Sequence, residues 1–343
     1  MRSIMKKYSI LMLMSKYHAV SGHTRVVDSL CIELEKMGHK VTLGSFDFKK
    51  EPPPKISKLE LNRINVTNTI NKGDYDIIHN HQTLMNYYLL FVNKPIIFHY
   101  HGASSLIQKI NLKISSIICN KKILKIISIS ESAKNEIKKY FFNTSNIVVY
   151  NGVNTNFYKN SGNASFKKGN PQLFFVGNLF EYKNIQFLIN IFPKIIQNYP
   201  DIHFQIVGKG EFKDNLIKLV KELKLGKKIE FVGRINDDEL KKYYSSSDIY
   251  ITASKWEFFN LPLLESMSCG KPILVSELPV HREIILKSKA GEIFEMNEKN
   301  LILKINNIIK NYDQFSQNAR KFALENDWNH AAVKISSVYR ELI

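Results

Sequence analysis

The sequence contains little cysteine, and its cysteines form no recognisable pattern. Its 343 residues include only Cys31, Cys119 and Cys269, which are odd in number and far apart. This spacing argues against a disulfide-stabilised secreted domain and against a cysteine-based zinc site, and it favours reduced thiols in a cytoplasmic protein. An Asp-x-Asp pair is also missing from the loops that follow the predicted strands, so we expect no carboxylate pair for a divalent cation there.

Long apolar runs are missing as well. None reaches 18 residues, which argues against a membrane-spanning helix. Residues 1–14 begin with basic side chains followed by Ile-Leu-Met-Leu-Met and superficially resemble a secretory signal peptide. The apolar part is too short, however, and no small-residue cleavage site follows it. We therefore expect a first β-strand at Tyr8–Met14.

Acidic residues are scarce relative to basic ones. The chain has 49 Lys and Arg against 31 Asp and Glu, a formal charge of +18, of which residues 1–160 carry +13 and residues 161–343 carry +5. A basic first half favours an anionic partner, such as acidic lipid headgroups, a lipid-linked diphosphate or nucleic acid. Nucleic acid is the least favoured of these because no aromatic–basic strand motif or zinc spacing is present. The alternative is a solvated surface that reflects overall residue usage.

The length suits two domains, and 44% hydrophobic and 23% charged residues are ordinary for globular chains. Short apolar runs alternate with amphipathic stretches, which is typical of βα units and parallel sheets. The sequence thus predicts an α/β fold with two doubly wound, Rossmann-like domains, residues 1–163 and 164–327, with a linker at Asn160–Asn170. Strands are expected at Tyr8–Met14, Lys40–Ser45, Ile77–Asn80, Pro95–Tyr100, Lys125–Ser128, Ile147–Tyr150, Leu173–Val176, His203–Val207, Ile229–Val232, Ile249–Ala253 and Pro272–Val275.

The stretch from Ser254 to Gly270 holds two carboxylates, Glu257 and Glu265, with seven residues between them. It follows an apolar strand, and a helix is expected to open near Pro262 because proline suits the first helical turn. Glu257 would then lie in the loop at the strand's carboxyl end and Glu265 in the first helical turn. Such loops bind ligands in open α/β sheets, and helix-start amides suit a diphosphate. A surface Glu and a Glu complementing the helix dipole are the alternative.

This stretch resembles the Glu–seven residues–Glu signature of the retaining glycosyltransferases of family 4, which have the GT-B fold. In the family it reads roughly Ser-x-x-Glu-Gly-Phe-Gly-Leu-Pro-Leu-Leu-Glu-Ala-Met-Ala-Cys-Gly, and here Phe258 and Asn260 replace two glycines. Ordered landmarks from Gly22 to Glu265 extend the resemblance over nearly the whole chain. The resemblance implies two domains facing a central cleft, with a C-terminal helix at 328–343 packing back on the first domain.

The resemblance also implies roles for individual residues. Glu257 would bind hydroxyls of the donor sugar and Glu265 those of the ribose. The loop from Val176 to Asn184 is similar to one in which Arg and Lys clamp the leaving diphosphate; Lys183 is present, but Asn178 replaces the arginine. The remaining donor-binding residues implied are Gly22, Lys209, Arg234, Phe259, Asn260 and Leu261. Gly22 matches a glycine loop that approaches the diphosphate, for which a generic capped strand-to-helix turn is the alternative.

Four histidines end two predicted strands as pairs spaced two apart, His79 with His81 and His99 with His101. This spacing places each pair on one face of its strand. No carboxylate or cysteine joins them at ligand spacing, so we expect no metal there. By resemblance, His101 borders the donor sugar, whereas His79 and His99 are expected to be packing or hydrogen-bonding residues.

The resemblance therefore implies a retaining, metal-independent glycosyltransferase without a cofactor, with Glu257, His101 and Lys183 as its catalytic residues. The donor would be a UDP- or GDP-linked sugar, and the acceptor a glycan or a polyprenyl-diphosphate-linked oligosaccharide of surface-polysaccharide synthesis. Ser104–Ile127 has isoleucines at helical spacing with lysines nearby, and predicts either a membrane-surface helix, giving peripheral attachment to the inner face of the cytoplasmic membrane, or a buried helix with a solvated lysine face. The alternatives are a nucleotide-sugar epimerase of the same fold, a non-catalytic nucleotide-sugar sensor and a basic nucleic-acid-binding protein.

Overall fold

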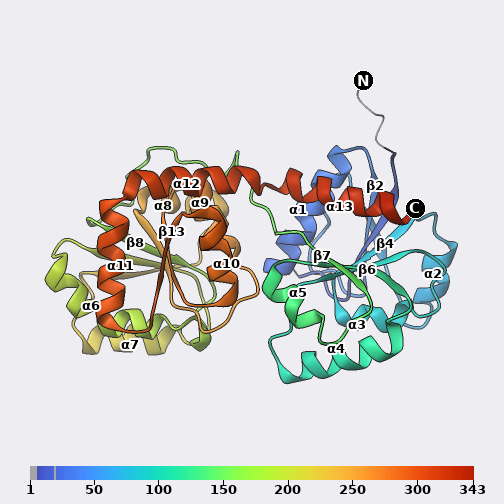
Figure 1. The fold of residues 1–343 in the computed structure, drawn as a ribbon, viewed down its shortest axis with the longest axis horizontal. Coiled ribbons are helices and arrows are strands. Elements are labelled where there is room, and N and C mark those ends of the chain that lie inside the picture. The colour runs from blue at the N-terminus through green and yellow to red at the C-terminus, as the bar shows by residue number, and fades with distance from the viewer. Residues whose placement is uncertain (1–5, 19–20) are drawn as a thin grey trace. The chain divides into compact units, whose positions relative to one another are not determined.

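The computed structural model describes residues 6–18 and 21–343 of the chain. It divides into two compact units, Met1–Gly152 with Trp328–Ile343 (unit 1) and Val153–Asp327 (unit 2), shown in Figure 1. The first five residues of the segment compared above with a signal peptide lie outside the described residues, and the rest of it contains the expected strand. None of the helices in the described part of the chain is both long and apolar enough to cross a lipid bilayer.

The division falls after Gly152 rather than near residue 163, because the expected linker is folded onto unit 2. The ring of Phe166 stacks on Tyr243 at 4.3 Å between centroids and an interplanar angle of 9°. Lys167 Nζ lies 2.8 Å from the carboxylate of Asp248. A segment rich in Gly, Asn and Ser shows no periodicity, so these contacts left no signal in the sequence.

Unit 1 is built on a seven-stranded parallel sheet with the order β3-β2-β1-β4-β5-β6-β7. Its strands match the six that were expected to within two residues at almost every end, and β3, which is mostly exposed, is an addition. The strands are β1 (Ser9–Met14), β2 (Lys40–Ser45), β3 (Ser57–Glu60), β4 (Ile77–Asn80), β5 (Ile96–Tyr100), β6 (Ile123–Ser128) and β7 (Ser145–Val148).

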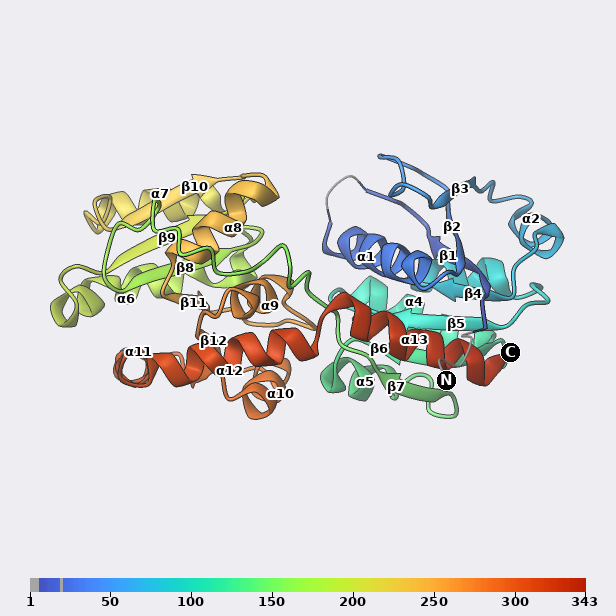
Figure 2. The same ribbon diagram turned by 90° about the horizontal axis from the view of Figure 1, so that it is seen from above.

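Helices cover both faces of this sheet, as right-handed crossovers require. In Figures 1 and 2, α1 (Gly22–Lys36) and α13 (Trp328–Leu342) lie together on one face, and α3 (Thr83–Asn86) and α4 (Leu106–Cys119) lie on the other. The terminal helix α13 belongs to unit 1 because it buries an apolar side that includes Ile335, Val338 and Tyr339 there. The remaining helices are α2 (Val66–Lys72), the 3₁₀ turn η1 (Tyr87–Leu89) and α5 (Glu131–Ile137).

Unit 2 contains a six-stranded parallel sheet with the order β10-β9-β8-β11-β12-β13. Its strands are β8 (Gln172–Val176), β9 (His203–Val207), β10 (Ile229–Gly233), β11 (Ile249–Thr252), β12 (Ile273–Ser276) and β13 (Gly291–Phe294), the last of which was not expected. The helices that flank it are η2 (Glu181–Lys183), α6 (Ile185–Asn198), α7 (Lys213–Glu222), α8 (Asp237–Ser246), α9 (Leu261–Ser268), α10 (Pro279–Ser288), α11 (Glu298–Lys310) and α12 (Tyr312–Glu325).

The two predicted doubly wound domains are therefore both present. Their strands are buried on both faces and so read as continuous apolar runs in the sequence, which is why the pattern located them. In each sheet the strand order reverses direction beside the first strand of the unit, β1 or β8. Ligands of open α/β sheets bind at the carboxyl ends of the strands at such a reversal.

At the carboxyl edge of unit 2, the turns after β8 and β9 are held in direct backbone contact. Gly177 N donates to Val207 O at 3.1 Å, and Leu179 N donates to Lys209 O at 2.9 Å. Gly208 has a φ of +144°, and a Cβ added to it would lie 1.9 Å from the carbonyl oxygen of Gly177. Only glycine fits there, so the two turns are fixed relative to each other before any ligand arrives.

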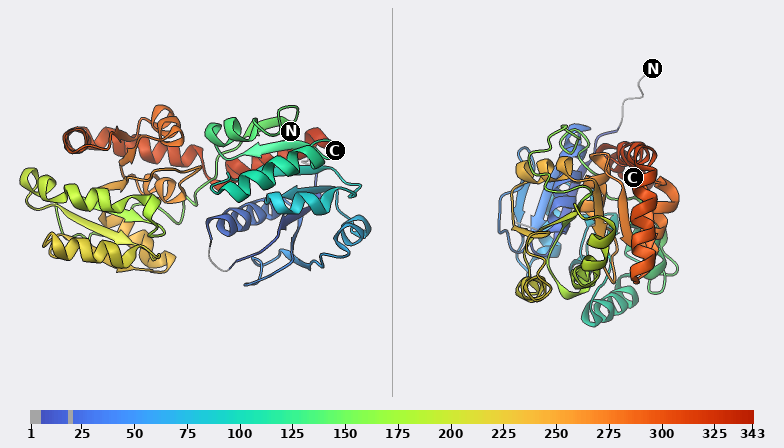
Figure 3. Two further views of the ribbon diagram at one scale, coloured as in Figure 1. Left: turned by 90° about the horizontal axis from the view of Figure 1, so that it is seen from below. Right: turned by 90° about the vertical axis from the view of Figure 1, so that its left-hand side faces the viewer.

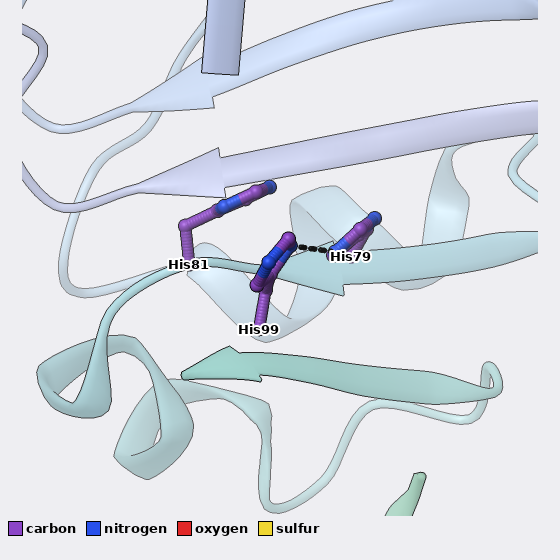
Figure 4. Close-up of side chains that lie close together, drawn as sticks. All are labelled: His79, His81 and His99. Carbon is purple, nitrogen blue, oxygen red and sulfur yellow. Dashed lines mark hydrogen bonds between the residues drawn. The ribbon is translucent and has the colours of Figure 1, made fainter. Parts of the chain in front are cut away.

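Unit 1 has buried histidines in its core. His79, His81 and His99 are each at most 2% exposed, and Figure 4 shows their rings gathered at the ends of β4 and β5. Burial lowers the pKa of His79 to about 3 and holds the pKa of His81 and of His99 well below the ordinary value. These rings are therefore neutral at pH 7.

We predict that Gly208→Ala destabilises unit 2 by about 2–4 kcal/mol, because the new methyl group displaces the turn that carries it. Gly226→Ala is the matched control, since a Cβ there meets nothing within 4 Å. Urea unfolding followed through Trp256 in a Trp328→Phe background measures this, because the chain has only these two tryptophans and Trp256 is the one in unit 2. Equal midpoints for the two variants would contradict the close approach.

We also predict that unit 1 loses stability as the pH falls below about 6.5. The unfolded histidines take up protons near that pH while the buried ones do not, so acid favours the unfolded chain. At pH 5 the contribution of His79, whose pKa is about 3, is a cost of about 2 kcal/mol, since one pKa unit corresponds to about 1.4 kcal/mol. Trp328 emission in a Trp256→Phe background reports on unit 1. His99→Gln should flatten the pH dependence relative to the exposed control His330→Gln, and an unchanged slope would refute the assignment.

Candidate functional site

The turn after β8 carries Lys183, which ends η2 directly before α6. Asn184 follows it in the left-handed region, at φ +55°, and is the N-cap of α6. Asparagine is among the few side chains that adopt this conformation readily, so it serves where the related loop has glycine. The sharp turn fixes the position of the Lys183 side chain at the carboxyl edge of the sheet.

Glu257 lies in the loop after β11 and forms an ion pair with Lys183 Nζ. The two side chains are 8% and 13% exposed, respectively. Ser254 Oγ donates a hydrogen bond of 2.9 Å to the same Glu257 oxygen, and Ser276 Oγ in turn donates to the backbone carbonyl of Ser254 at 2.7 Å. The carboxylate is thus oriented by three residues from β12 and two separate loops.

His281, in the first turn of α10, belongs to the same region. Its Nδ1 donates to the carbonyl of Ser276 at 2.8 Å, and its buried Nε2 has no hydrogen-bond partner among the described residues. Burial lowers the pKa of His281, while the nearby carboxylate of Glu257 opposes that shift. The ring is neutral and supports the Ser276–Ser254–Glu257 chain of hydrogen bonds from beneath.

Glu265 is buried in α9, and its Oε2 accepts a hydrogen bond of 2.8 Å from Tyr244. It was expected in the first helical turn, but α9 begins at Leu261, so Glu265 stands in the second turn. The helix starts one residue before Pro262 because Asn260 takes the extended N-cap conformation. Glu265 therefore cannot complement the first turn as a dipole partner.

The loop before α9 differs in detail from the expectation that its side chains face a donor. Asn260 is buried, and its amide side chain pairs with the Tyr250 hydroxyl at 3.3 to 3.4 Å. No side chain caps the helix, so the first amides of α9 receive no side-chain hydrogen bond at the N-cap. Phe259 is half-buried against the core of unit 2, and Leu261 is half-buried at the helix start. Neither Phe258 nor Asn260, which replace the family glycines, has a positive φ.

Three further predicted residues lie on neighbouring turns of unit 2. Asn178 follows β8, Lys209 follows β9 and Arg234 follows β10, and all three are exposed. Neither Lys209 nor Arg234 forms an ion pair with any described residue, so both charges are available. The sheet order places these turns in sequence along one edge.

Unit 1 brings Gly22 and His101 into one neighbourhood. Gly22 opens α1 behind the N-cap Ser21, whose hydroxyl accepts from Thr24 N at 3.0 Å. The ring of His23 meets that of His101 edge-on at 4.3 Å between centroids. A Cβ on Gly22 would meet nothing within 4 Å, so the packing of the described residues does not itself require a glycine there.

The histidines extend from His101 into the core as a stack. His81 Nδ1 lies 3.0 Å from His101 Nε2, His79 Nε2 lies 3.2 Å from His99 Nδ1, and His79 Nδ1 lies 2.6 Å from the Tyr339 hydroxyl (Figure 4 shows the His79–His99 contact). Burial lowers the pKa of His23 to about 4 and holds the pKa of His101 well below its ordinary value. His101 is thus a neutral imidazole oriented by His81.

Ligand atoms of His79, His81 and His99 lie within 4.8 Å of one another, the spacing of a metal site. Their rings are close to parallel, at 14–30°, and 4.5–5.2 Å apart. In-plane lone pairs of parallel rings point side by side rather than at one centre, and tetrahedral zinc needs convergent ligands. Both nitrogens of His79 are also engaged in hydrogen bonds. The donor set therefore fits stacked packing better than coordination, and a metal-independent protein stays our prediction.

Sequence reasoning missed the residues that support these groups. Tyr244, Tyr250 and His281 carried no motif, because their roles depend on packing between segments. His23 is the exception, because it directly follows Gly22, one of the predicted donor-binding residues.

Comparison with known proteins matches two family models to consecutive parts of the chain. Residues 20–157 match "Glycosyltransferase Family 4" and residues 157–322 match "Glycosyl transferases group 1". Two uncharacterised glycosyltransferases of Methanocaldococcus jannaschii are similar to this chain. One is 29% identical over 63% of this chain and 59% of its own length, and the other is 28% identical over 80% of this chain and 78% of its own length. A phosphatidyl-myo-inositol mannosyltransferase of Propionibacterium freudenreichii is 21% identical over 80% of this chain and 73% of its own.

Among solved structures, Anabaena HepE in complex with UDP has the same fold. It superposes with a TM-score of 0.83 at 17% identity, covering 97% of this chain and all of the other. The two family models together account for nearly all of the chain, in the order of its two units. The chain therefore belongs to the group 1 glycosyltransferases, which have the GT-B fold.

Proposed function

We propose that this protein transfers a sugar from a nucleoside diphosphate sugar to a glycan or lipid-linked acceptor, with retention at the anomeric carbon and without a metal ion. The observation that carries this proposal is the ion pair between Lys183 and Glu257 at the carboxyl edge of unit 2. One member has the charge to neutralise a leaving diphosphate, and the other can accept hydrogen bonds from sugar hydroxyls.

The pair is arranged to exchange partners when the donor binds. In the structure the Glu257 carboxylate neutralises Lys183, which keeps a nearly buried ammonium from standing alone. A diphosphate takes over Lys183, and Glu257, still oriented by Ser254, turns its oxygens to the sugar. Donor binding thereby completes the site.

Other groups of unit 2 supply the rest of the diphosphate charge balance. Asn178 lacks the guanidinium that the related loop has, so a bidentate clamp is missing there. Lys209 and Arg234 are exposed and without ion-pair partners among the described residues, and the α9 start offers backbone amides. We assign recognition of the ribose hydroxyls to Glu265. The hydrogen bond from the Tyr244 hydroxyl to Oε2 orients this carboxylate and thereby directs its Oε1.

The bond that breaks joins the anomeric carbon to the diphosphate. Positive charge develops on the sugar while negative charge develops on the leaving oxygen, and Lys183 with the helix amides stabilises the latter. The acceptor hydroxyl replaces the diphosphate on the same face and loses its proton to the departing phosphate oxygen. In unit 1, His101 is neutral and can hydrogen-bond a sugar hydroxyl, and the open space above Gly22 admits a close ligand.

We predict that Lys183→Ala and Glu257→Gln each lower kcat by about 10²–10³, the usual effect of removing one group that stabilises the developing charge. UDP- and GDP-sugars are assayed in excess EDTA with a lipid extract as acceptor, and release of the nucleoside diphosphate is measured. Lys227→Ala is the control, because Lys227 is exposed and forms no ion pair with the described residues.

Full turnover in Glu257→Gln would remove that residue from the reaction. Donor consumption that needs no acceptor and gives an isomeric nucleotide sugar would identify an epimerase instead. Nucleotide binding without any turnover would identify a sensor, and activity lost in EDTA and restored by a divalent cation would refute the metal-free step.

The acceptor is the less defined substrate, and helix α4 gives the main indication. Six of its apolar residues form an exposed stripe: Leu106, Ile107, Ile110, Ile114, Ile117 and Ile118 are 42–75% exposed. Its buried side is formed by Leu112, Ser115, Ser116 and Cys119. In the view from below in Figure 3, α4, in teal, runs along the outside of unit 1.

The exposed face of α4 is also basic. Lys109 and Lys113 lie on the helix and Lys121 follows it, all exposed, while the first-turn residues include no acid. An apolar stripe bordered by lysines is the pattern of helices that lie in the surface of an anionic bilayer. We propose that α4 attaches unit 1 to such a surface, where a lipid-linked acceptor is held. The similarity to a phosphatidyl-myo-inositol mannosyltransferase supports this choice.

We predict that the double substitution Ile107→Glu/Ile117→Glu weakens binding to phosphatidylglycerol–phosphatidylcholine vesicles at least tenfold, because inserting these two exposed isoleucines into the bilayer contributes more than 1.4 kcal/mol. Leu303→Glu is the control, since Leu303 is 60% exposed in α11 of unit 2. Co-sedimentation at two salt concentrations separates the lysine contribution from the apolar one. Equal binding of both variants, or none by the parent protein, would overturn the assignment.

A further inference from the structure

A pocket of unit 2 is lined by residues to which no role has been given above. It has a volume of about 460 Å³, within the usual range for small-molecule sites, and its lining residues are Phe180, Glu181, Tyr182, Glu211 and Lys255. They come from the turns that follow β8, β9 and β11, three neighbouring strands of the sheet. All three turns belong to unit 2, so the pocket is part of the fold of that unit.

Backbone hydrogen bonds tie the three turns together around the pocket. Phe212 N donates to Leu179 O at 3.0 Å, which joins the turns after β8 and β9. Lys255 N donates to Tyr182 O at 2.8 Å, which joins the turns after β8 and β11. A Cβ on Gly210 would lie 2.4 Å from the Leu179 carbonyl oxygen, so this approach also depends on glycine. The walls are preorganised, which lowers the cost of binding.

Two aromatic rings contribute to the lining of the pocket. Phe180 and Tyr182 lie 5.9 Å apart between centroids at 29°, and Tyr182 is stacked on Trp256 at 4.3 Å and 20°. Trp256 is 38% exposed, so this stack is partly open to solvent. Flat aromatic walls of this kind accept the C–H face of a pyranose ring, because their negative faces attract weakly positive C–H groups.

Charged groups make up the rest of the lining, and they do not form ion pairs with one another. Neither Glu181 nor Glu211 forms an ion pair with Lys255 or with any other described residue. Two carboxylates against one ammonium leave the lining net negative, which repels a phosphate group. Carboxylates accept hydrogen bonds strongly, and vicinal hydroxyls are their natural donors. The lining therefore suits a neutral, polyhydroxylated ring rather than a nucleotide.

The pocket lies beside the phosphate-binding lysine. The Lys183 ammonium is 5.3 Å from the centroid of the Tyr182 ring, which is itself one of the residues that line the pocket. We propose that this pocket is a saccharide subsite that takes one neutral pyranose residue of the acceptor glycan, between the aromatic pair and the two carboxylates. This proposal rests on the proposed function only for naming the sugar as part of the acceptor.

Fluorescence of Trp256 tests the proposal directly. In a Trp328→Phe background the only tryptophan is the one stacked on Tyr182, so a ring entering the pocket changes its emission. The probes are the methyl glycosides of glucose, galactose, mannose and N-acetylglucosamine, titrated into the full chain with and without saturating UDP and GDP. We expect at least one to bind and to leave nucleotide affinity unchanged.

Two substitutions locate the binding. Phe180→Ala removes one aromatic wall and Glu211→Gln one hydroxyl acceptor, and each should weaken glycoside binding about tenfold without altering nucleotide affinity. The controls are Phe142→Ala, an exposed aromatic of unit 1, and Glu222→Gln, an exposed carboxylate on α7. Thermal unfolding of all four variants verifies that they fold.

Each outcome decides one of the two proposals. No emission change with any of the four glycosides overturns the subsite, and so does competition between a glycoside and the nucleotide, since the pocket would then belong to the donor. Binding that survives both substitutions places the sugar elsewhere and also overturns it. Absence of nucleotide binding by the parent protein would instead refute the proposed transferase function, whatever the glycosides do.

Discussion

The close backbone approach of the turns at the carboxyl edge of unit 2 is the constraint on which the candidate site depends. Gly208 leaves no room for a side chain against the Gly177 carbonyl, and Gly210 leaves none against Leu179. The turns therefore hydrogen-bond to each other as well as to their own strands. Lys183 stands at the end of the first of these turns, so its position is set by the sheet rather than by a ligand. A cation held in place before the donor arrives costs no reorganisation when charge develops on the leaving group.

The Lys183–Glu257 pair shows why such a site is stable while empty. Two nearly buried charges would each carry a desolvation penalty if left alone, and their attraction together with the Ser254 hydrogen bond offsets it. Because the partners come from different turns, the pair also links the loop after β11 to the turn after β8. In the proposed donor complex, a diphosphate replaces Glu257 as the partner of Lys183, and the carboxylate is not left unpaired because sugar hydroxyls donate to it. The same contact thus serves the folded state and the proposed donor complex.

The sequence located what depends on local pattern and could not locate what depends on contact between distant segments. The central strands were predictable because a parallel sheet buries both faces of its strands. The strands β3 and β13 were missed because β3 is mostly exposed and β13 has only four residues, of which two are apolar. Glu257 and Lys183 were each found from their motifs, but their pairing joins residues 74 positions apart and follows from strand order. Glu265 was expected in the first turn of its helix but stands in the second. The helix begins earlier because its N-cap Asn260 is held against Tyr250, a contact that no local rule specifies. The boundary near residue 163 failed because composition cannot show where a polar segment packs.

Helix α4 shows how buried hydrogen bonds can determine which side of a helix packs inward, even when most of its apolar residues are then left exposed. Its spacing predicted a helix, yet both orientations remained open. In the structure the Asn86 amide donates to Ser115 Oγ at 2.9 Å, and Asn86 itself accepts from Asn80 at 2.6 Å. Turning the isoleucines inward would leave these buried amides without partners, at about 1–3 kcal/mol each. The polar network therefore fixes the serine side of α4 against α3 and η1 and leaves the isoleucine side exposed. Isolated exposed isoleucines are normal but a continuous stripe is not, and the proposed attachment of α4 to an anionic bilayer accounts for both the stripe and its lysines.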